Sequence, residues 1–190
     1  AWRARAVSLY SENQLDEPLL LLQRLREDSS KLPARIRLTT SPAISSNMAY
    51  YFYKRAKYDA ALEWLRRASQ AEERAYGTAD AATRLRLAAA LARMKRHSGA
   101  LDECRAAIAV LQASAHVGDG AEGANAQRGL TAMLAVAYHN SAIELAHTRQ
   151  LAEASGVAHV ALTLAASSVG ACHAWCRVTR ASCARLRDAH

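Results

Sequence analysis

The sequence contains few of the residues that break helices or build strands. Its 190 residues include only 8 glycines, 3 prolines and 6% aromatic residues. This scarcity favours helices and argues against a β-sandwich, which needs many turns and short strands. Alanine, leucine and arginine dominate instead, and a hydrophobic share of 51% is ample for a continuous core. We therefore expect a core of Leu and Ala side chains, whose small volumes suit close contact between helices.

Long apolar runs and paired cysteines are also missing. The longest uncharged apolar run near the start, Leu19 to Leu22, falls far short of the roughly 20 residues that span a bilayer. Four cysteines are too few and too unevenly placed for a secreted disulfide framework, so we predict an intracellular protein in a reducing compartment. The chain opens with Ala1 rather than methionine and shows no cleavable signal pattern, so we interpret it as a fragment of a larger protein.

Positive charge is in excess. Lys and Arg outnumber Asp and Glu by 25 to 17, which gives a formal charge of +8. Such a balance indicates a partner with an acidic surface, either protein or nucleic acid, and does not choose between them.

A frame of small and large apolar residues recurs along the chain. In its clearest copy, Asn47 to Ala68, large residues recur every three or four positions, and the pattern predicts two antiparallel helices with a turn near Lys57. Ala61 has its counterpart in Ala100, and then in Ala154 after a longer interval. The extra length of the second interval is attributed to an inserted loop from about Ala113 to Gln127.

This frame resembles the tetratricopeptide repeat (TPR), in a long-repeat form similar to flagellar and cytoskeletal scaffold proteins. The resemblance implies an all-α fold, a right-handed superhelical solenoid of antiparallel helical hairpins within a single domain over 1–190. We expect hairpins at about 1–27, 44–73, 80–112 and 130–168, and an amphipathic capping helix at about 171–189.

The same resemblance implies a non-catalytic scaffold or adaptor that binds extended or helical protein segments in a multi-subunit assembly, and the net positive charge favours segments with acidic surfaces. A cytoskeletal place, in a cilium or flagellum, is the narrower expectation. Such arrays bind partners in a groove lined by the first helix of each hairpin. We predict that the groove contains Asn47, Tyr51, Arg86 and Asn140.

Other binding chemistries remain open as alternatives. An RNA-associated helical-repeat protein of a ribonucleoprotein is the runner-up, because the run from Tyr50 to Arg55 mixes aromatic rings with cations. A clamp for a C-terminal carboxylate is matched only in part: Arg3, Asn47 and Arg86 fit it, whereas Val7 and Ala82 replace two of its polar members.

Candidate sites for cofactors, metals and catalysis are weak, so we predict no cofactor, no metal and no enzyme activity. The run from Gly118 to Gly123 matches a dinucleotide fingerprint in letters, but it lacks the preceding strand. Cys172, Cys176, Cys183 and His190 share one helical face yet extend too far along it to hold one metal ion. The seven histidines show no defined spacing to a nucleophile and a carboxylate.

Overall fold

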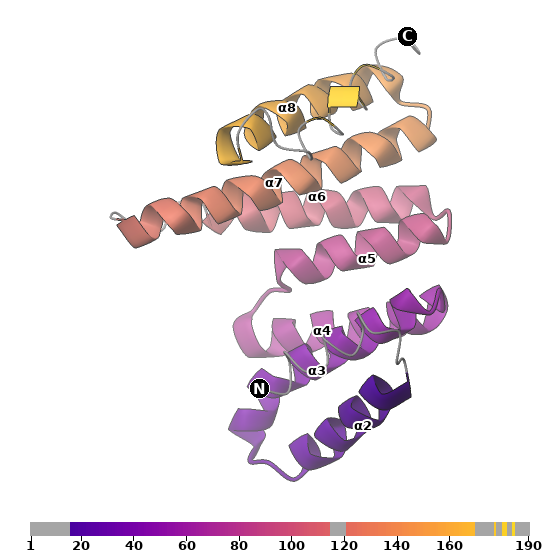
Figure 1. Cartoon of the computed structure of the whole chain (residues 1–190), viewed down its shortest axis with the longest axis vertical. Coiled ribbons are helices and arrows are strands. Elements are labelled where there is room, and N and C mark those ends of the chain that lie inside the picture. Colours follow the sequence, from indigo (N-terminus) through magenta and orange to yellow (C-terminus); the bar gives the residue numbers. More distant parts are fainter. Residues whose placement is uncertain (1–15, 115–120, 170–176, 178–179, 182–183, 185–190) are drawn as a thin grey trace. The chain divides into compact units, whose positions relative to one another are not determined.

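Helices make up the described structure. The computed structural model describes residues 16–114 and 121–169, and residues 177, 180, 181 and 184. Within the two long ranges the helices follow one another without a strand, which confirms the predicted all-α class (Figure 1). They are α2 (Asp16–Ser30), α3 (Ala34–Lys54), α4 (Tyr58–Tyr76), α5 (Ala81–Arg93), α6 (His97–Ala113), α7 (Ala121–His147) and α8 (Leu151–Val169).

The chain divides into two compact units, Ala1–Ala90 and Leu91–His190, with the boundary inside α5. In the first unit α3 packs against both α2 and α4, and in the second α7 packs against both α6 and α8. The single domain over 1–190 stays a prediction. Residues 1–15 of the first expected hairpin, and most of the expected capping helix at 171–189, lie outside the described residues.

Three turns of the same geometry join the helix pairs. Ala56, Lys95 and Arg149 adopt the left-handed conformation, with φ of 56°, 59° and 62°. The amide that follows each of them by one residue donates to a carbonyl five residues back, over 3.0, 2.9 and 2.9 Å respectively. Each turn stands at the same offset before one of the alanines that align the sequence frame, namely Ala61, Ala100 and Ala154. The predicted repeat register and the turn near Lys57 are therefore confirmed.

Small residues let the paired helices approach closely. Ala49 of α3 and Ala61 of α4 are both fully buried. Ala100 of α6 and Ala154 of α8 stand at the positions equivalent to Ala61, and both are buried too. Alanine has no side-chain entropy to lose in a helix, and its volume leaves room for a neighbouring backbone. The repeated alanines thus leave room for a neighbouring helix at the same position of α4, α6 and α8.

Two helices begin earlier than expected. α3 starts at Ala34, well before the predicted 44, because residues 31–39 are exposed and carry no apolar stripe that would reveal a helix. Pro42 lies inside this helix, although proline lacks the N–H of a regular turn. α7 starts at Ala121, inside the predicted loop of 113–127, and its exposed residues 125–129 likewise leave no apolar signal.

Candidate partner-binding surface

Each of α3, α5 and α7 carries a row of accessible side chains in the same register, and we call these rows together the first-helix stripe. On α3 it contains Ala43, Asn47, Tyr50 and Lys54, spaced by four, three and four residues, the spacing of one helical face. The repeat register carries this stripe to α5 and α7. The equivalent residues are Ala82, Arg86, Ala89 and Arg93 on α5, and Val136, Asn140, Ile143 and His147 on α7.

In the first unit the stripe is polar and cationic. The Arg86 guanidinium donates to the Ser46 hydroxyl over 3.1 Å, which holds α5 and α3 together beside Asn47. The Asn47 amide donates to the Ala43 carbonyl over 2.8 Å. Further along α3, the Lys54 ammonium lies 5.4 Å from the centre of the Tyr50 ring. This part of the stripe therefore presents amide, aromatic and cationic groups.

In the second unit the stripe is more apolar. Val136 and Ile143 each expose 36% of their surface, a large fraction for aliphatic residues within a helix. At the end of α7 the His147 ring stacks on that of His97, with the ring centres 4.2 Å apart. His97 Nδ1 in turn lies 2.7 Å from the buried carboxylate of Glu144. This contact fixes the histidine pair at the end of the stripe.

The stripe contains three of the four predicted groove residues, and the fourth is buried. Asn47, Arg86 and Asn140 occupy one register position of the stripe in α3, α5 and α7. Tyr51 does not, because it is only 2% exposed and packs with Leu22 and Met48 in the core of the first unit. Its register equivalents, Ala90 and Glu144, are buried as well.

Tyr50, not Tyr51, is the accessible aromatic residue at this end of α3. Its side chain is 40% exposed, and it lies three residues after Asn47 on the same face. Sequence reasoning missed it because four aromatic residues are adjacent between positions 50 and 53, so composition alone does not say which one points outward. The repeat register was the available signal, since it aligns Tyr50 with a surface position of α5.

A cleft in the first unit is a second candidate, and we call it the arginine cleft. It has a volume of about 300 Å³ and opens between α2, α3 and α4. Among the residues that the structure describes, no acidic side chain lines it. Its lining residues are Arg26, Ser29, Ser41, Ile44, Ser45, Trp64, Arg67, Gln70, Ala71 and Arg74.

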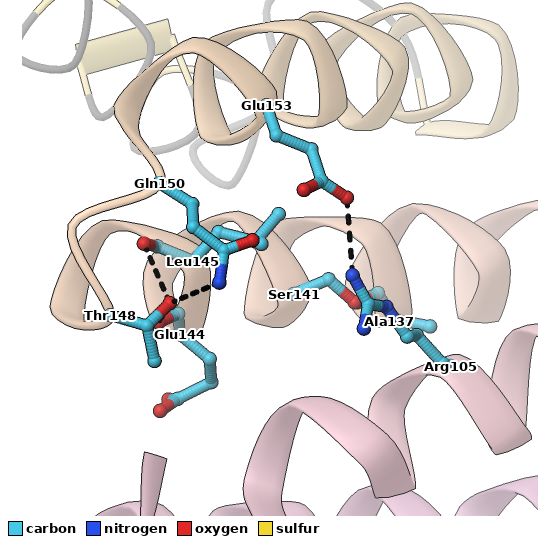
Figure 2. Close-up of polar contacts among 8 residues, drawn as sticks. All are labelled: Arg105, Ala137, Ser141, Glu144, Leu145, Thr148, Gln150 and Glu153. Atoms are coloured by element: carbon cyan, nitrogen blue, oxygen red, sulfur yellow. Dashed lines mark hydrogen bonds and ion pairs between the residues drawn. The ribbon is translucent and has the colours of Figure 1, made fainter. Parts of the chain in front are cut away.

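A smaller, mainly apolar pocket of about 230 Å³ lies in the second unit between α6, α7 and α8. An ion pair from Arg105 to Glu153, with 3.1 Å between nitrogen and oxygen, links α6 to α8 beside it (Figure 2). The Ser141 hydroxyl, on the pocket wall, is occupied in a 2.9 Å bond to the Ala137 carbonyl. With these polar groups already paired, the pocket is suited to packing rather than to recognition.

Burial shifts the pKa values of two titratable groups in the second unit. Burial raises the pKa of the Cys104 thiol to about 12, while a hydrogen bond with Ser141 lowers it in part. Burial also lowers the pKa of His139. A thiol with so high a pKa is a poor nucleophile at neutral pH.

The described residues contain no group of three or more His, Cys, Asp or Glu side chains that could hold a metal ion. Cys172, Cys176, Cys183 and His190 lie outside them, as do Gly118 of the glycine run and Arg3 and Val7 of the partial clamp. No helix within the described part of the chain is long and apolar enough to cross a membrane.

Comparison with solved structures identifies the fold. Two crystal structures of a kinesin light chain-like protein from Podosopora anserina, described as nearly identical TPR-like repeats, match the chain with TM-scores of 0.68 and 0.67. The chain has a TPR-like fold. The alignments cover 99% of this chain and 84% of each of those chains, at 18% and 17% sequence identity. No protein-family model and no curated protein matches the sequence.

The TPR-like fold assigns the described helices to repeat units. α3–α4 and α7–α8 pack as helical hairpins, and a turn of the same geometry at Lys95 joins α5 to α6. The first-helix stripe therefore lies on the helices that line the groove in such arrays. Both the predicted TPR resemblance and the predicted solenoid of hairpins are confirmed by this similarity.

Proposed function

We propose that this TPR-like chain is a non-catalytic protein-interaction module, a scaffold or adaptor whose first-helix stripe receives an extended or helical segment of another protein. The observation that carries the proposal is the recurrence of accessible residues at one register in three first helices. TPR-like folds generally mediate protein–protein interaction, and a groove lined by first helices suits such segments.

The chemistry of the stripe indicates the partner. Arg86 and Lys54 are exposed cations on the part formed by α3 and α5, and the whole chain carries a formal charge of +8. Acidic side chains of a partner would be attracted there. Val136 and Ile143 on α7 would suit apolar side chains. The proposed partner is therefore a protein with acidic side chains for the stripe of the first unit and apolar side chains for the stripe of the second unit.

The cellular setting is proposed by analogy. The structural neighbours come from a kinesin light chain-like protein, and we propose a comparable place for this chain in a multi-subunit cytoskeletal assembly, with a cilium or flagellum as the narrower setting. An intracellular, reducing compartment fits the cysteine usage.

RNA association within a ribonucleoprotein is the second candidate, favoured by the net charge and by the run from Tyr50 to Arg55. The side-chain contacts weaken it. Lys54 lies over the Tyr50 ring at 5.4 Å and Arg55 over the Tyr51 ring at 5.3 Å, so each cation covers an aromatic face that stacking on a base would need.

Affinity purification from native cells tests the proposal, with this chain as bait and mass spectrometry as readout. We expect a defined set of proteins that survives nuclease. The Lys54→Glu, Arg86→Glu double variant should lose that set, because it reverses the charge of the stripe. Arg24→Glu with Arg66→Glu is the matched control, since both arginines are exposed and lie outside the stripe. Captured proteins that disappear after nuclease treatment would support the RNA alternative. Equal capture by the stripe variant and the control variant would refute the proposal that the stripe binds the partner.

A further inference from the structure

We propose that the arginine cleft of the first unit is an oxyanion site that takes the phosphate of a phosphorylated side chain on a partner protein. The inference rests on the proposed function and extends it, because the phosphate would be carried by a bound protein segment. It assigns that phosphate to a cleft distinct from the first-helix stripe, since the two share no residue.

The first argument is uncompensated positive charge. Arg26 from α2 and Arg67 and Arg74 from α4 all line the cleft. None of the three forms an ion pair with a carboxylate among the residues that the structure describes. Arg67 and Arg74 are two turns apart, or roughly 10 Å along one face of α4, so their charges flank the cleft instead of sharing one spot. An anion between them would relieve the repulsion among three like charges.

The second argument is the contact of two guanidinium groups with one aromatic ring. Arg67 lies over the Trp64 ring with its central carbon 4.6 Å from the ring centre, and Arg26 lies 5.8 Å from it. Trp64 itself packs against the buried cluster that includes Leu22 and Met48. A guanidinium stacked on a ring keeps its N–H edge available for an acceptor. Less side-chain freedom then remains to be lost when an anion binds.

The third argument is a hydroxyl that can donate into the cleft. Ser45 lines the cleft and is only 6% exposed, yet its hydroxyl forms no hydrogen bond with any residue that the structure describes. Its oxygen is accessible from the cleft, because it is not among the fully buried side-chain nitrogens and oxygens that lack a partner, so this hydroxyl can donate to an anion bound there. Ser29, the other buried serine of the lining, already shares a 3.3 Å bond with Thr40.

Size and charge distribution favour phosphate over carboxylate. The volume of about 300 Å³ is about ten times the ~30 Å³ that one water molecule occupies in the liquid, so a tetrahedral phosphate and several waters can enter together. One arginine can bind both oxygens of a carboxylate with two parallel hydrogen bonds. A phosphate has three acceptor oxygens and up to two negative charges, which match several cations on different sides of the cleft and a hydroxyl donor.

The experiment uses the full chain and follows the side-chain indole N–H of Trp64 by NMR, assigned with Trp64→Phe, while the ligand is titrated. O-phosphoserine and inorganic phosphate are the probes, and serine and glutamate are the comparison ligands. We expect saturable shifts with both phosphates and an affinity for glutamate at least tenfold weaker. Glutamate binding as tightly as O-phosphoserine would overturn the phosphate assignment, and no saturable shift with either phosphate would overturn the site.

Variants test whether the NMR shift of Trp64 arises from binding in the arginine cleft. Arg67→Gln with Arg74→Gln should weaken O-phosphoserine at least tenfold, and Ser45→Ala should weaken it several-fold. Arg66→Gln is the control, because Arg66 neighbours Arg67 in sequence but does not line the cleft. Unchanged thermal unfolding would show that the variants are folded, and equal affinities for the double variant and the control would refute the proposal. Such a failure is distinguishable from failure of the proposed function, whose test changes only residues of the stripe.

Discussion

Glu72 shows how a single residue can join two helices. Its buried carboxylate accepts the Asp80 backbone N–H over 2.9 Å and the Thr83 hydroxyl over 2.8 Å. Asp80 immediately precedes α5, so the last turns of α4 cap the start of the next helix. The negative charge is favourable there, because the N-terminus of a helix carries partial positive charge.

Removal of this carboxylate should therefore cost stability. We expect Glu72→Ala to lower the free energy of unfolding by about 2–3 kcal/mol, since two hydrogen bonds to a charged acceptor are lost and the buried Thr83 hydroxyl loses its partner. Urea unfolding followed by circular dichroism measures this. Glu73→Ala, the exposed neighbour, should change stability by less than about 1 kcal/mol. Equal losses for the two variants would contradict the capping role.

Cys104 gives the second prediction at this scale. Its folded pKa of about 12 lies above the ordinary value of 9.0, so the folded thiol is protonated at pH 8. An alkylating reagent should modify Cys104 at least about a hundredfold more slowly in the folded chain than in urea, because the thiolate is the reactive form. Mass spectrometry of the Cys104 peptide separates it from the other cysteines. Rapid labelling of the folded protein would show that Cys104 is not buried as described.

The sign of the linked pH dependence follows from the same shift. A thiol whose pKa is raised by folding binds its proton more tightly in the folded state. Its contribution to stability is complete below about pH 9 and decreases as pH rises toward 12. Cys104→Ala should therefore flatten the alkaline part of the curve of unfolding free energy against pH, and an unchanged slope would contradict the shift.

The turn residues carry a prediction at the scale of the element. Ala56, Lys95 and Arg149 hold positive φ values without being glycine. A side chain in this conformation costs about 1 kcal/mol or more, whereas glycine adopts it freely. Each change to glycine should therefore raise stability by roughly 0.5 kcal/mol, because the entropy lost by glycine on folding offsets part of the gain.

Thermal unfolding of the three single variants tests this, and the triple variant should be more stable than any single variant. Ala60→Gly, in the first turn of α4, is the control and should destabilise the chain by up to about 1 kcal/mol. Destabilisation by all three turn variants would mean that the left-handed conformation is absent.

The elements were predictable from the sequence where their faces are buried. Alanine and leucine recur with the helical period from Met48 to Ala68, so the turn between α3 and α4 and the buried Ala49 and Ala61 were predictable. The exposed starts of α3 and α7 gave no such period and were missed. Tyr51 was assigned to the groove for a related reason: a run of adjacent aromatic residues has no period of its own.

At the scale of the whole molecule, the fold was predictable and the arginine cleft was not. Recurrence of one frame at Ala61, Ala100 and Ala154 identifies a helical solenoid, because each hairpin must cover the next one. The cleft depends on Arg26 and Arg67, which are distant in sequence and come together only through the packing of α2 and α4 on α3. No local spacing of residues predicts such a site, and because surface arginines are common in this sequence, their presence alone does not indicate one.

Net charge gives the last prediction, because +8 makes weak attraction to any polyanion unavoidable. We expect a single-stranded poly(U) oligomer to bind weakly at about 50 mM salt and to be released by about 200 mM, since each phosphate contact is lost by counterion exchange. Fluorescence anisotropy of a labelled oligomer measures the affinity at both salt concentrations.

A true partner segment should behave differently. The apolar contacts proposed for Val136 and Ile143 do not depend on counterions, so the affinity of the captured protein should fall much less than that of poly(U) over the same salt range. The Lys54→Glu, Arg86→Glu variant would then weaken the protein complex at both salt concentrations. The opposite result would be poly(U) that stays bound at the higher salt while the protein complex dissociates. RNA association would then rank above the protein-interaction proposal, because base stacking would contribute more than the apolar contacts of the stripe.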